Sequence, residues 1–251
     1  MPRKVTTKMD LLQRLQKYYE SKGISAENFK CPHEDNCKAN SPNFIEATEA
    51  YVGSRYGYGK FPRLLLITAG PGRNYDWTQK DRTVCGIREL WAKCNTAEAH
   101  KGKWWYRTNE LALVMLRNFE EDLDIAEVKD YFAYTDSEKC SQNKEHARQN
   151  DSRLFKNCSE FIPEEVRILS PDIVITQGVK AREFIEGSFK PGDYLGKRKR
   201  IPSEIKVIKV KNNAVLWIDT VHPTRRGLSN LERRKNWKAY SRLAYAFVNK
   251  P

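Results

Sequence analysis

Four cysteines in two distant pairs are the residues of this chain best suited to chemistry. The pairs are Cys31 with Cys37 and Cys140 with Cys158. Thiolates bind soft metals, so the four could hold an iron-sulfur cluster or, because His33 lies inside the first pair, a zinc ion with mixed ligands. Reduced thiols without metal are the alternative, and we assign that role to Cys85 and Cys94.

The start of the sequence favours a reducing compartment. No apolar signal-peptide core follows MPRKVTTKMD, and no apolar run is long enough to cross a membrane. Disulfides persist mainly in oxidising compartments, so metal ligation explains paired cysteines better here. We expect a cytoplasmic monomer that does not bind membranes.

The charge of the chain points to a polyphosphate partner. The formal net charge is +13 over 251 residues, and basic residues gather at 197–200, 225–226 and 233–235. Such patches are typical of proteins that bind nucleic acid, although each run could equally form a solvated surface. The aromatic residues at 104–106, among basic neighbours, could stack on bases or anchor a helix in the core.

Buried strands alternating with helices are expected to position these groups. The apolar run at 64–67 is typical of a strand buried on both faces, and a tight turn follows it. We predict a three-layer α/β/α sandwich around a central, mainly parallel sheet of four or five strands. Residues 1–251 are expected to form one domain, on which residues 1–60 pack as an N-terminal helix and cluster-binding extension.

The individual elements follow from hydrophobic spacing and from glycine. A first helix is expected to end at Gly23, a second to begin at Cys158, a third to close at Gly187, and an amphipathic helix to end the chain. Further strands are predicted at 131–135, 172–176, 206–210 and 215–221.

Ligands of such sheets bind beyond the carboxyl ends of the strands, so the residues that follow each strand are the candidates for a site. Four such segments stand out: Gly70-Pro71-Gly72, Asp136, Gln177-Gly178 and the run from His222 to Arg226.

Taken in order, these segments resemble the motifs of one family. LLLITAGPG, AYTDSEKC, SPDIVITQGVKAREFI and VHPTRR resemble successive motifs of the uracil-DNA glycosylase superfamily, most closely its iron-sulfur branch, families 4 and 5. The resemblance covers roughly residues 31–245. It implies a 4Fe-4S cluster on Cys31, Cys37, Cys140 and Cys158, distant from the chemistry, and places iron-sulfur above zinc.

The resemblance also implies base excision, in which a nucleotide is flipped out of DNA and its glycosidic bond is broken. His222 would donate a hydrogen bond to the departing base, and the amides of the Gly70 to Gly72 turn would hold the base and a phosphate. The DNA itself would be contacted by Thr224, Arg225, Arg226 and Lys180.

The first departure from the family concerns the catalytic carboxylate. Ala69 and Gly70 stand where other branches place acidic or amide side chains, so neither position can activate water. Asp76 is our first candidate for orienting water or stabilising the sugar cation, and Asn74 is the second.

The other departures concern the base. Asp136 stands where the family reads uracil with Asn; an ionised carboxylate only accepts hydrogen bonds, which suits the amino group of cytosine and repels a uracil carbonyl. Val84 replaces a Phe that stacks on uracil, and together with Ala69 and Gly70 it predicts a roomier pocket.

These departures favour a modified cytosine as the substrate. Excision of ordinary cytosine would destroy the host genome, so we expect a base substituted at ring carbon 5, including glucosylated forms, in phage DNA, and a role in defence. No Schiff-base lysine is identifiable, which favours a monofunctional glycosylase. The alternatives are a uracil or deaminated-base glycosylase of DNA repair and a catalytically inactive, DNA-binding member of the superfamily.

Overall fold

A mixed β-sheet forms the centre of the computed structural model, which describes residues 8–39, 44–70, 78, 80–93, 104–142, 152–197, 204–223 and 229–249. Its seven strands lie in the order β2-β4-β3-β6-β9-β8-β7. They are β2 (Tyr51–Val52), β3 (Leu64–Thr68), β4 (Phe132–Asp136), β6 (Ile173–Gln177), β7 (Pro191–Lys197), β8 (Glu204–Val210) and β9 (Asn213–Thr220).

The predicted α/β class is confirmed by the four central strands. β4, β3, β6 and β9 run parallel, and three antiparallel strands, β2, β8 and β7, extend the sheet beyond the predicted four or five. The predicted strand at 206–210 is β8, and a tight turn joins it to β9, with which it pairs antiparallel. Lys211 takes the left-handed backbone at φ 56° that such a hairpin turn requires.

Helices cover the sheet and occupy its connections. They are α1 (Lys8–Lys22), α2 (Glu34–Lys38), α3 (Val84–Lys93), α4 (Trp104–Leu116), α5 (Ser152–Cys158), α6 (Ile162–Leu169), α7 (Val179–Ser188) and α8 (Asn230–Val248), with 3-10 turns η1 (Lys80–Arg82) and η2 (Val128–Tyr131). Gly23 ends α1 with φ 65°, as predicted. The prediction that Cys158 opens a helix is wrong, because Cys158 ends α5. Pro163 fits only the first turn of a helix, so the next helix starts at Ile162.

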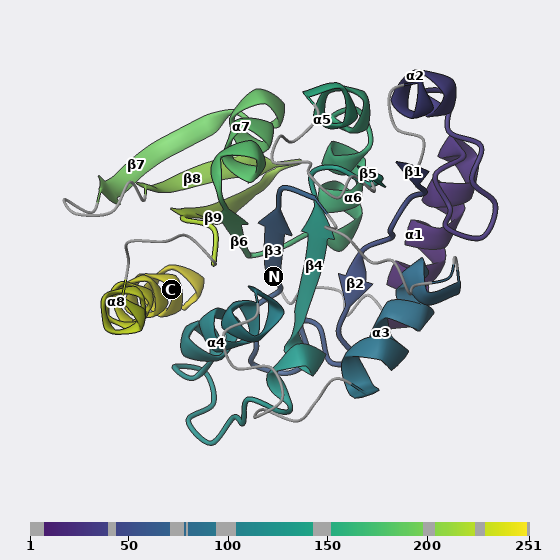
Figure 1. Ribbon diagram of the computed structural model, residues 1–251. Helices are drawn as coiled ribbons and strands as arrows, with labels where there is room; N and C mark the ends of the chain where they lie inside the picture. Colours follow the sequence, from purple (N-terminus) through teal and green to yellow (C-terminus); the bar gives the residue numbers. More distant parts are fainter. Residues whose placement is uncertain are drawn as a thin grey trace.

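The two faces of the sheet carry separate cores, as alternating strand side chains require. Leu65 and Ile67 of β3 pack in one core with residues of α1, α6 and α7. Leu64 and Leu66 pack in the other with residues of α4 and α8. Figure 1 shows α4 and α8 together on one side of the sheet, and α1, α5, α6 and α7 beyond it. The layers therefore form the expected α/β/α sandwich.

The N-terminal helix is joined to the sheet by a buried polar network. The hydroxyl of Tyr19 donates to the carboxylate of Glu165 in α6, and Lys139 Nζ lies 2.8 Å from the same carboxylate. Thr135 Oγ1 of β4 donates to Glu165 Oε2 at 2.7 Å. These four side chains are almost completely buried, so the network fixes α1 and α6 against β4.

A small sheet pairs β1 (Phe44–Ile45) with β5 (Ser141–Gln142), directly after Cys140. None of the helices within the described ranges is long and apolar enough to cross a membrane.

Candidate functional site

Polar side chains collect at the carboxyl ends of the parallel strands, on the face covered by α4 and α8. Leu66, Tyr134, Ile175 and Ile218 belong to the core of that face. Because strand side chains alternate, the residue two positions after each faces the same way. These residues are Thr68, Asp136, Gln177 and Thr220, and all four are buried. The sheet therefore brings to one edge the ends of all four strands at which the predicted segments begin.

Asp136 is held by two hydroxyl groups through one of its two carboxylate oxygens. Thr68 Oγ1 and Tyr134 OH both donate to Oδ1, the latter at 2.5 Å, and the two hydroxyls lie 2.7 Å apart. Register makes the first contact possible, because Thr68 of β3 lies directly opposite Asp136 of β4. Among the described residues, nothing is hydrogen-bonded to Oδ2.

The environment of Asp136 brings its ionisation close to neutral pH. Burial raises the pKa of Asp136 to about 6, the hydrogen bonds from Thr68 and Tyr134 and the charge of Lys139 oppose that rise, and Glu165 adds to it. Burial and the neighbouring Asp136 also raise the pKa of Tyr134 well above its usual range, so Tyr134 remains a donor.

Glu138, which the sequence did not single out, lies beside Gly70. The amides of Ser137 and Glu138 donate to the carbonyls of Thr68 and Ala69 at 2.8 and 2.9 Å, which continues the contact between the ends of β4 and β3. A Cβ atom on Gly70 would lie 2.9 Å from Glu138 Oε2. The side chain missing at Gly70 therefore leaves no extra room there, contrary to the prediction, because the carboxylate of Glu138 occupies that space.

His222 follows β9 and lies next to Gly178 at the end of β6. A Cβ on Gly178 would contact His222 Cβ at 3.6 Å, and Gly178 has φ 105°, a conformation that favours glycine. Burial lowers the pKa of His222, and the positive charge of Arg233 lowers it further. His222 is therefore a neutral imidazole at pH 7, which can donate one hydrogen bond and accept another.

Two arginines from the covering helices hold the segment after β9. Arg233 Nη1 of α8 donates to the His222 carbonyl at 3.2 Å, and Arg107 Nη1 of α4 donates to the Pro223 carbonyl at 2.8 Å. Thr108, next to Arg107, donates to Gln177 Oε1 at 3.2 Å, which joins the same helix to the end of β6. The helices of this face thus position the strand ends as well as cover them.

Of the basic run at 233–235, for which the sequence predicted a surface patch, Arg234 and Lys235 are exposed and only Arg233 is not. Arg233 is buried, with 3% of its surface exposed. Arg234 forms an ion pair with Glu110 at 2.5 Å. Both residues lie in α8, whose packing against α4 turns part of a polar sequence inward. The residues at 104–106 form the first turn of α4.

The other predicted contacts are placed as follows. Lys180 lies in the first turn of α7, 3.0 Å from Glu183 Oε2 and 4.8 Å from the ring centre of Phe155. Val84 is buried in the core beneath α1, and its amide donates to Glu49 Oε2 at 2.9 Å. Asn74, Asp76, Gly72, Thr224, Arg225, Arg226, Cys94 and the basic residues at 198–200 lie outside the described residues.

The four paired cysteines converge on the opposite face of the sheet. Lys139 N, adjacent to Cys140, donates to Cys158 Sγ at 3.3 Å, and Asn157 Nδ2, adjacent to Cys158, donates to Cys37 Sγ at 3.2 Å. Burial raises the pKa of Cys140, and the nearby thiols of Cys158, Cys31 and Cys37 raise it further. All four are free thiols, and so is Cys85, which is exposed.

The chemistry of this cysteine group suits a thiolate-bound cluster. N–H donors directed at sulfur stabilise thiolate ligands, and the neighbouring Lys139 supplies positive charge. In a 4Fe-4S cluster each thiolate binds a different iron, so the sulfurs stand farther apart than ligands of one ion do. Within the described ranges no group of three or more His, Cys, Asp or Glu side chains is arranged to hold a single metal ion. His33, the other candidate ligand, is paired with Glu160.

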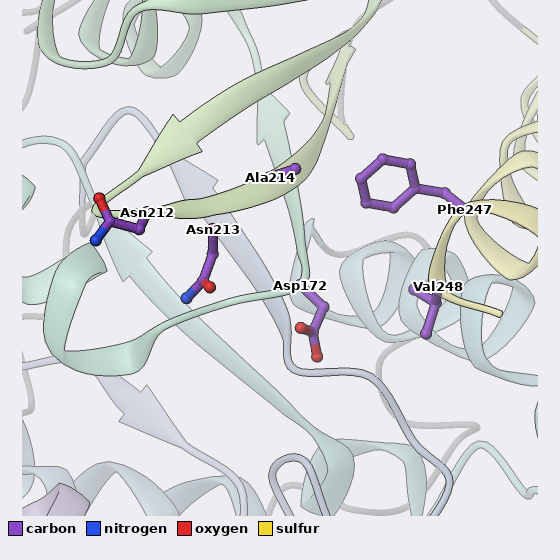
Figure 2. A pocket seen from close by; sticks show the side chains of 6 residues that line it. All are labelled: Asp172, Asn212, Asn213, Ala214, Phe247 and Val248. Carbon is purple, nitrogen blue, oxygen red and sulfur yellow. The ribbon is translucent and has the colours of Figure 1, made fainter. Parts of the chain in front are cut away.

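A cavity of about 310 Å³ opens at the opposite edge of the sheet (Figure 2). It is lined by Asp172, Asn212, Asn213, Ala214, Phe247 and Val248. Asp172 precedes β6 and Asn213 begins β9, so this cavity lies at the amino ends of the strands, away from Asp136 and His222.

A scan of known protein families and a search of curated proteins find no match to this chain. Its function therefore has to be inferred from its own residues and their geometry.

Proposed function

We propose that the protein is a monofunctional DNA glycosylase that flips out and excises a cytosine-type base substituted at ring carbon 5, as found in foreign or phage DNA. The observation that carries the proposal is the placement of Asp136 and His222 at one edge of the parallel sheet. Strands lie about 4.8 Å apart, so the three steps from β4 to β9 span roughly 14 Å. A nucleotide held between inward-facing side chains can bridge that width.

The hydrogen bonds of Asp136 support cytosine over uracil. Thr68 and Tyr134 donate to Oδ1, which leaves Oδ2 to meet the base. An ionised Oδ2 accepts from an exocyclic amino group and repels a carbonyl oxygen. The substitution at ring carbon 5 rests on the need to spare ordinary cytosine in the host genome.

His222 is suited to stabilise the leaving base. Burial and Arg233 lower its pKa, so the neutral ring can donate a hydrogen bond to the negative charge that develops on the base. The fixed carbonyls of His222 and Pro223 keep the ring in place while the bond breaks. Thr224, Arg225, Arg226 and Lys180 are the proposed DNA contacts.

Cys31, Cys37, Cys140 and Cys158 are the proposed ligands of a 4Fe-4S cluster. When bound, the cluster would cross-link the N-terminal segment, the end of β4 and α5, without taking part in base excision. The iron and sulfide content of anaerobically purified protein tests this assignment, together with absorbance near roughly 400 nm. Colourless protein that contains zinc would contradict it.

The activity is tested by measuring base release from duplex and single-stranded oligonucleotides. Each would carry one uracil, cytosine, 5-hydroxymethylcytosine or glucosylated 5-hydroxymethylcytosine. We expect abasic sites only with the substituted cytosines, and no strand cleavage before alkali treatment. Release of uracil alone would support the repair alternative. Salt-sensitive DNA binding without release of any base would support the inactive alternative.

His222→Ala provides the matched control for that assay. We expect it to lose about 10²- to 10³-fold in excision rate, because one donor to the developing anion is removed, while DNA affinity is retained. A variant with the wild-type rate would show that His222 does not contact the leaving base.

A further inference from the structure

We infer that Glu138 is the catalytic carboxylate of this site, taking the place of the acidic side chain absent from the turn after β3. The inference rests on the proposed glycosylase function and deepens it. In this chain Ala69 and Gly70 can supply no carboxylate of their own. The geometry points to a carboxylate that reaches the same position from the neighbouring strand.

The position of Glu138 is fixed by the backbone. Its amide donates to the Ala69 carbonyl at 2.9 Å, and the preceding Ser137 donates to the Thr68 carbonyl through both its amide and its hydroxyl, at 2.8 and 2.5 Å. These three bonds join the end of β4 to the end of β3. The backbone of Glu138 is therefore held beside Ala69 and Gly70 without depending on its own side chain.

The side chain of Glu138 occupies the space that a larger residue at position 70 would need. A Cβ on Gly70 would lie 2.9 Å from Oε2, 3.4 Å from Cβ and 3.6 Å from Cδ of Glu138. The described backbone of Gly70 does not have positive φ, so glycine is not required there by conformation. A side chain at position 70 would displace the Glu138 carboxylate from this place.

Asp136 and Glu138 line the end of β3 at successive outward positions. Asp136 meets Thr68, and Glu138 meets Gly70, two residues farther along the chain. Asp136 therefore lies beside the last residue of β3, where we place the base, and Glu138 lies beyond the end of β3, where we place the sugar. Only 6% of Glu138 is exposed, and a carboxylate so shielded from water acts strongly on nearby charge.

In the reaction that this placement supports, the oxygen of a water molecule bonds to C1′ of the sugar. The bond from C1′ to the base breaks, and its electron pair leaves with the base. One proton of the attacking water passes to the Glu138 carboxylate and then to solvent. His222 stabilises the base anion until solvent protonates it. The carboxylate also faces the positive charge that develops on the sugar before water attacks.

The test compares single-turnover base release by Glu138→Gln with release by the wild type on the best substrate found above. Gln keeps the shape of Glu138 but cannot accept the proton, so we expect the rate to fall at least about 100-fold with DNA affinity unchanged. Glu164→Gln is the matched control, because Glu164 lies half-exposed in α6, paired with Arg167 at 3.2 Å. It should keep the wild-type rate.

A carboxylate exchange separates catalysis from packing. Gly70→Asp alone should be slow, since its Cβ would lie 2.9 Å from Glu138 Oε2, and Glu138→Ala alone should be slow because it lacks the carboxylate. The double variant Gly70→Asp/Glu138→Ala restores one carboxylate to the same space. We expect it to excise faster than either single variant, even if Glu138→Gln proves unstable on heating.

Each result bears on a different claim. Wild-type rates in Glu138→Gln would overturn the role of Glu138 and leave the glycosylase proposal intact. A double variant no faster than Glu138→Ala would overturn the claim that positions 70 and 138 share one function. A wild-type protein that releases no base would overturn the proposed function, and with it this inference.

Discussion

Asp136 uses its two carboxylate oxygens unequally, and this decides what it can recognise. Oδ1 takes two hydroxyl donors, from Thr68 and Tyr134, which fixes the plane of the carboxyl group. A side-chain amide in the same place would direct its oxygen to these donors and its NH2 group to the base. Replacing the Oδ2 oxygen by an NH2 group would then change the preferred base from cytosine to uracil.

Asp136→Asn is therefore expected to shift excision toward uracil. The amide NH2 group would replace Oδ2 and donate to a carbonyl oxygen, where the carboxylate repels it. A single hydrogen bond to a charged group is worth about 1.5–3 kcal/mol, or roughly 10- to 150-fold in relative rate. Competition between uracil and substituted cytosine in one reaction measures the shift. An unchanged ratio would mean that Asp136 does not contact the base.

The raised pKa of Asp136 predicts a pH dependence for the same contact. With a pKa of about 6, the carboxylate is ionised above that pH and protonated below it. Only the ionised form accepts from the amino group, so excision of the cytosine-type base should rise as pH increases through about 6. Asp136→Asn removes the titrating group and should flatten this rise. A profile that keeps its midpoint in the variant would assign the titration to another group.

At the scale of elements, α4 and α8 do more than cover the sheet. The side chains of Arg107 in α4 and Arg233 in α8 each donate a hydrogen bond to a backbone carbonyl of the segment that carries His222. The two helices also pack against each other, and Asn118 of the turn after α4 donates to Ser241 of α8 at 2.8 Å. The position and the charge state of His222 therefore depend on how this helix pair sits on the sheet.

Arg233→Met should disturb His222 without touching the substrate. Met keeps much of the buried stem but removes both the donor to the His222 carbonyl and the nearby positive charge. The pKa of His222 should rise, because Arg233 lowers it, and excision should fall by up to about 100-fold from misplacement of the ring. Titration of the histidine ring protons by NMR reads out the pKa directly.

Arg234→Met is the control for this variant. Arg234 is the next residue of α8, but its partner is Glu110, and a surface ion pair contributes about 1 kcal/mol at most. We expect it to leave the pKa of His222 and the excision rate unchanged. Equal effects of the two variants would show that the helix, and not the contact of Arg233, is what matters.

At the scale of the whole molecule, the two faces of the sheet have separate tasks. The face under α4 and α8 carries the candidate site, and the face under α1 and α6 carries the cysteines and the Tyr19–Lys139–Glu165 network. Lys139 belongs to both the network and the cysteine group, since its side chain binds Glu165 and its amide binds Cys158. Consecutive residues of β4 serve the two faces, because Thr135 binds Glu165 of the network and Asp136 belongs to the candidate site.

Glu165→Ala should destabilise the fold by about 3–5 kcal/mol, because it leaves the ammonium of Lys139 buried beside one neutral hydroxyl. Urea unfolding, monitored by far-UV circular dichroism, measures the loss. Glu164→Ala, its partly exposed neighbour in α6, should cost less than about 0.5 kcal/mol. Similar midpoints for the two variants would mean that the buried network contributes little to stability.

The sequence by itself determined the parallel core of the sheet and the strand ends that carry polar residues. Continuous apolar runs such as 64–67 are typical of strands buried on both faces, and the residues that follow parallel strands meet at one edge of the sheet. His222 and Asp136 were identified as candidates in this way, and the four cysteines were identified by their pairing along the chain. These assignments depend on local pattern and chain order, which a sequence states directly.

Only the tertiary structure decided which side chains share a space. Glu138 fills the position beside Gly70 because β3 and β4 pair with Thr68 opposite Asp136, and no local pattern reports that register. Arg233 is buried although it sits in a basic run, because α8 turns that side toward His222. Val84 packs in the same core as residues of α1, and this contact too depends on how distant segments pack. Contacts between distant segments arise from packing of the whole chain, so Glu138, the proposed catalytic carboxylate, could not be singled out from local pattern alone.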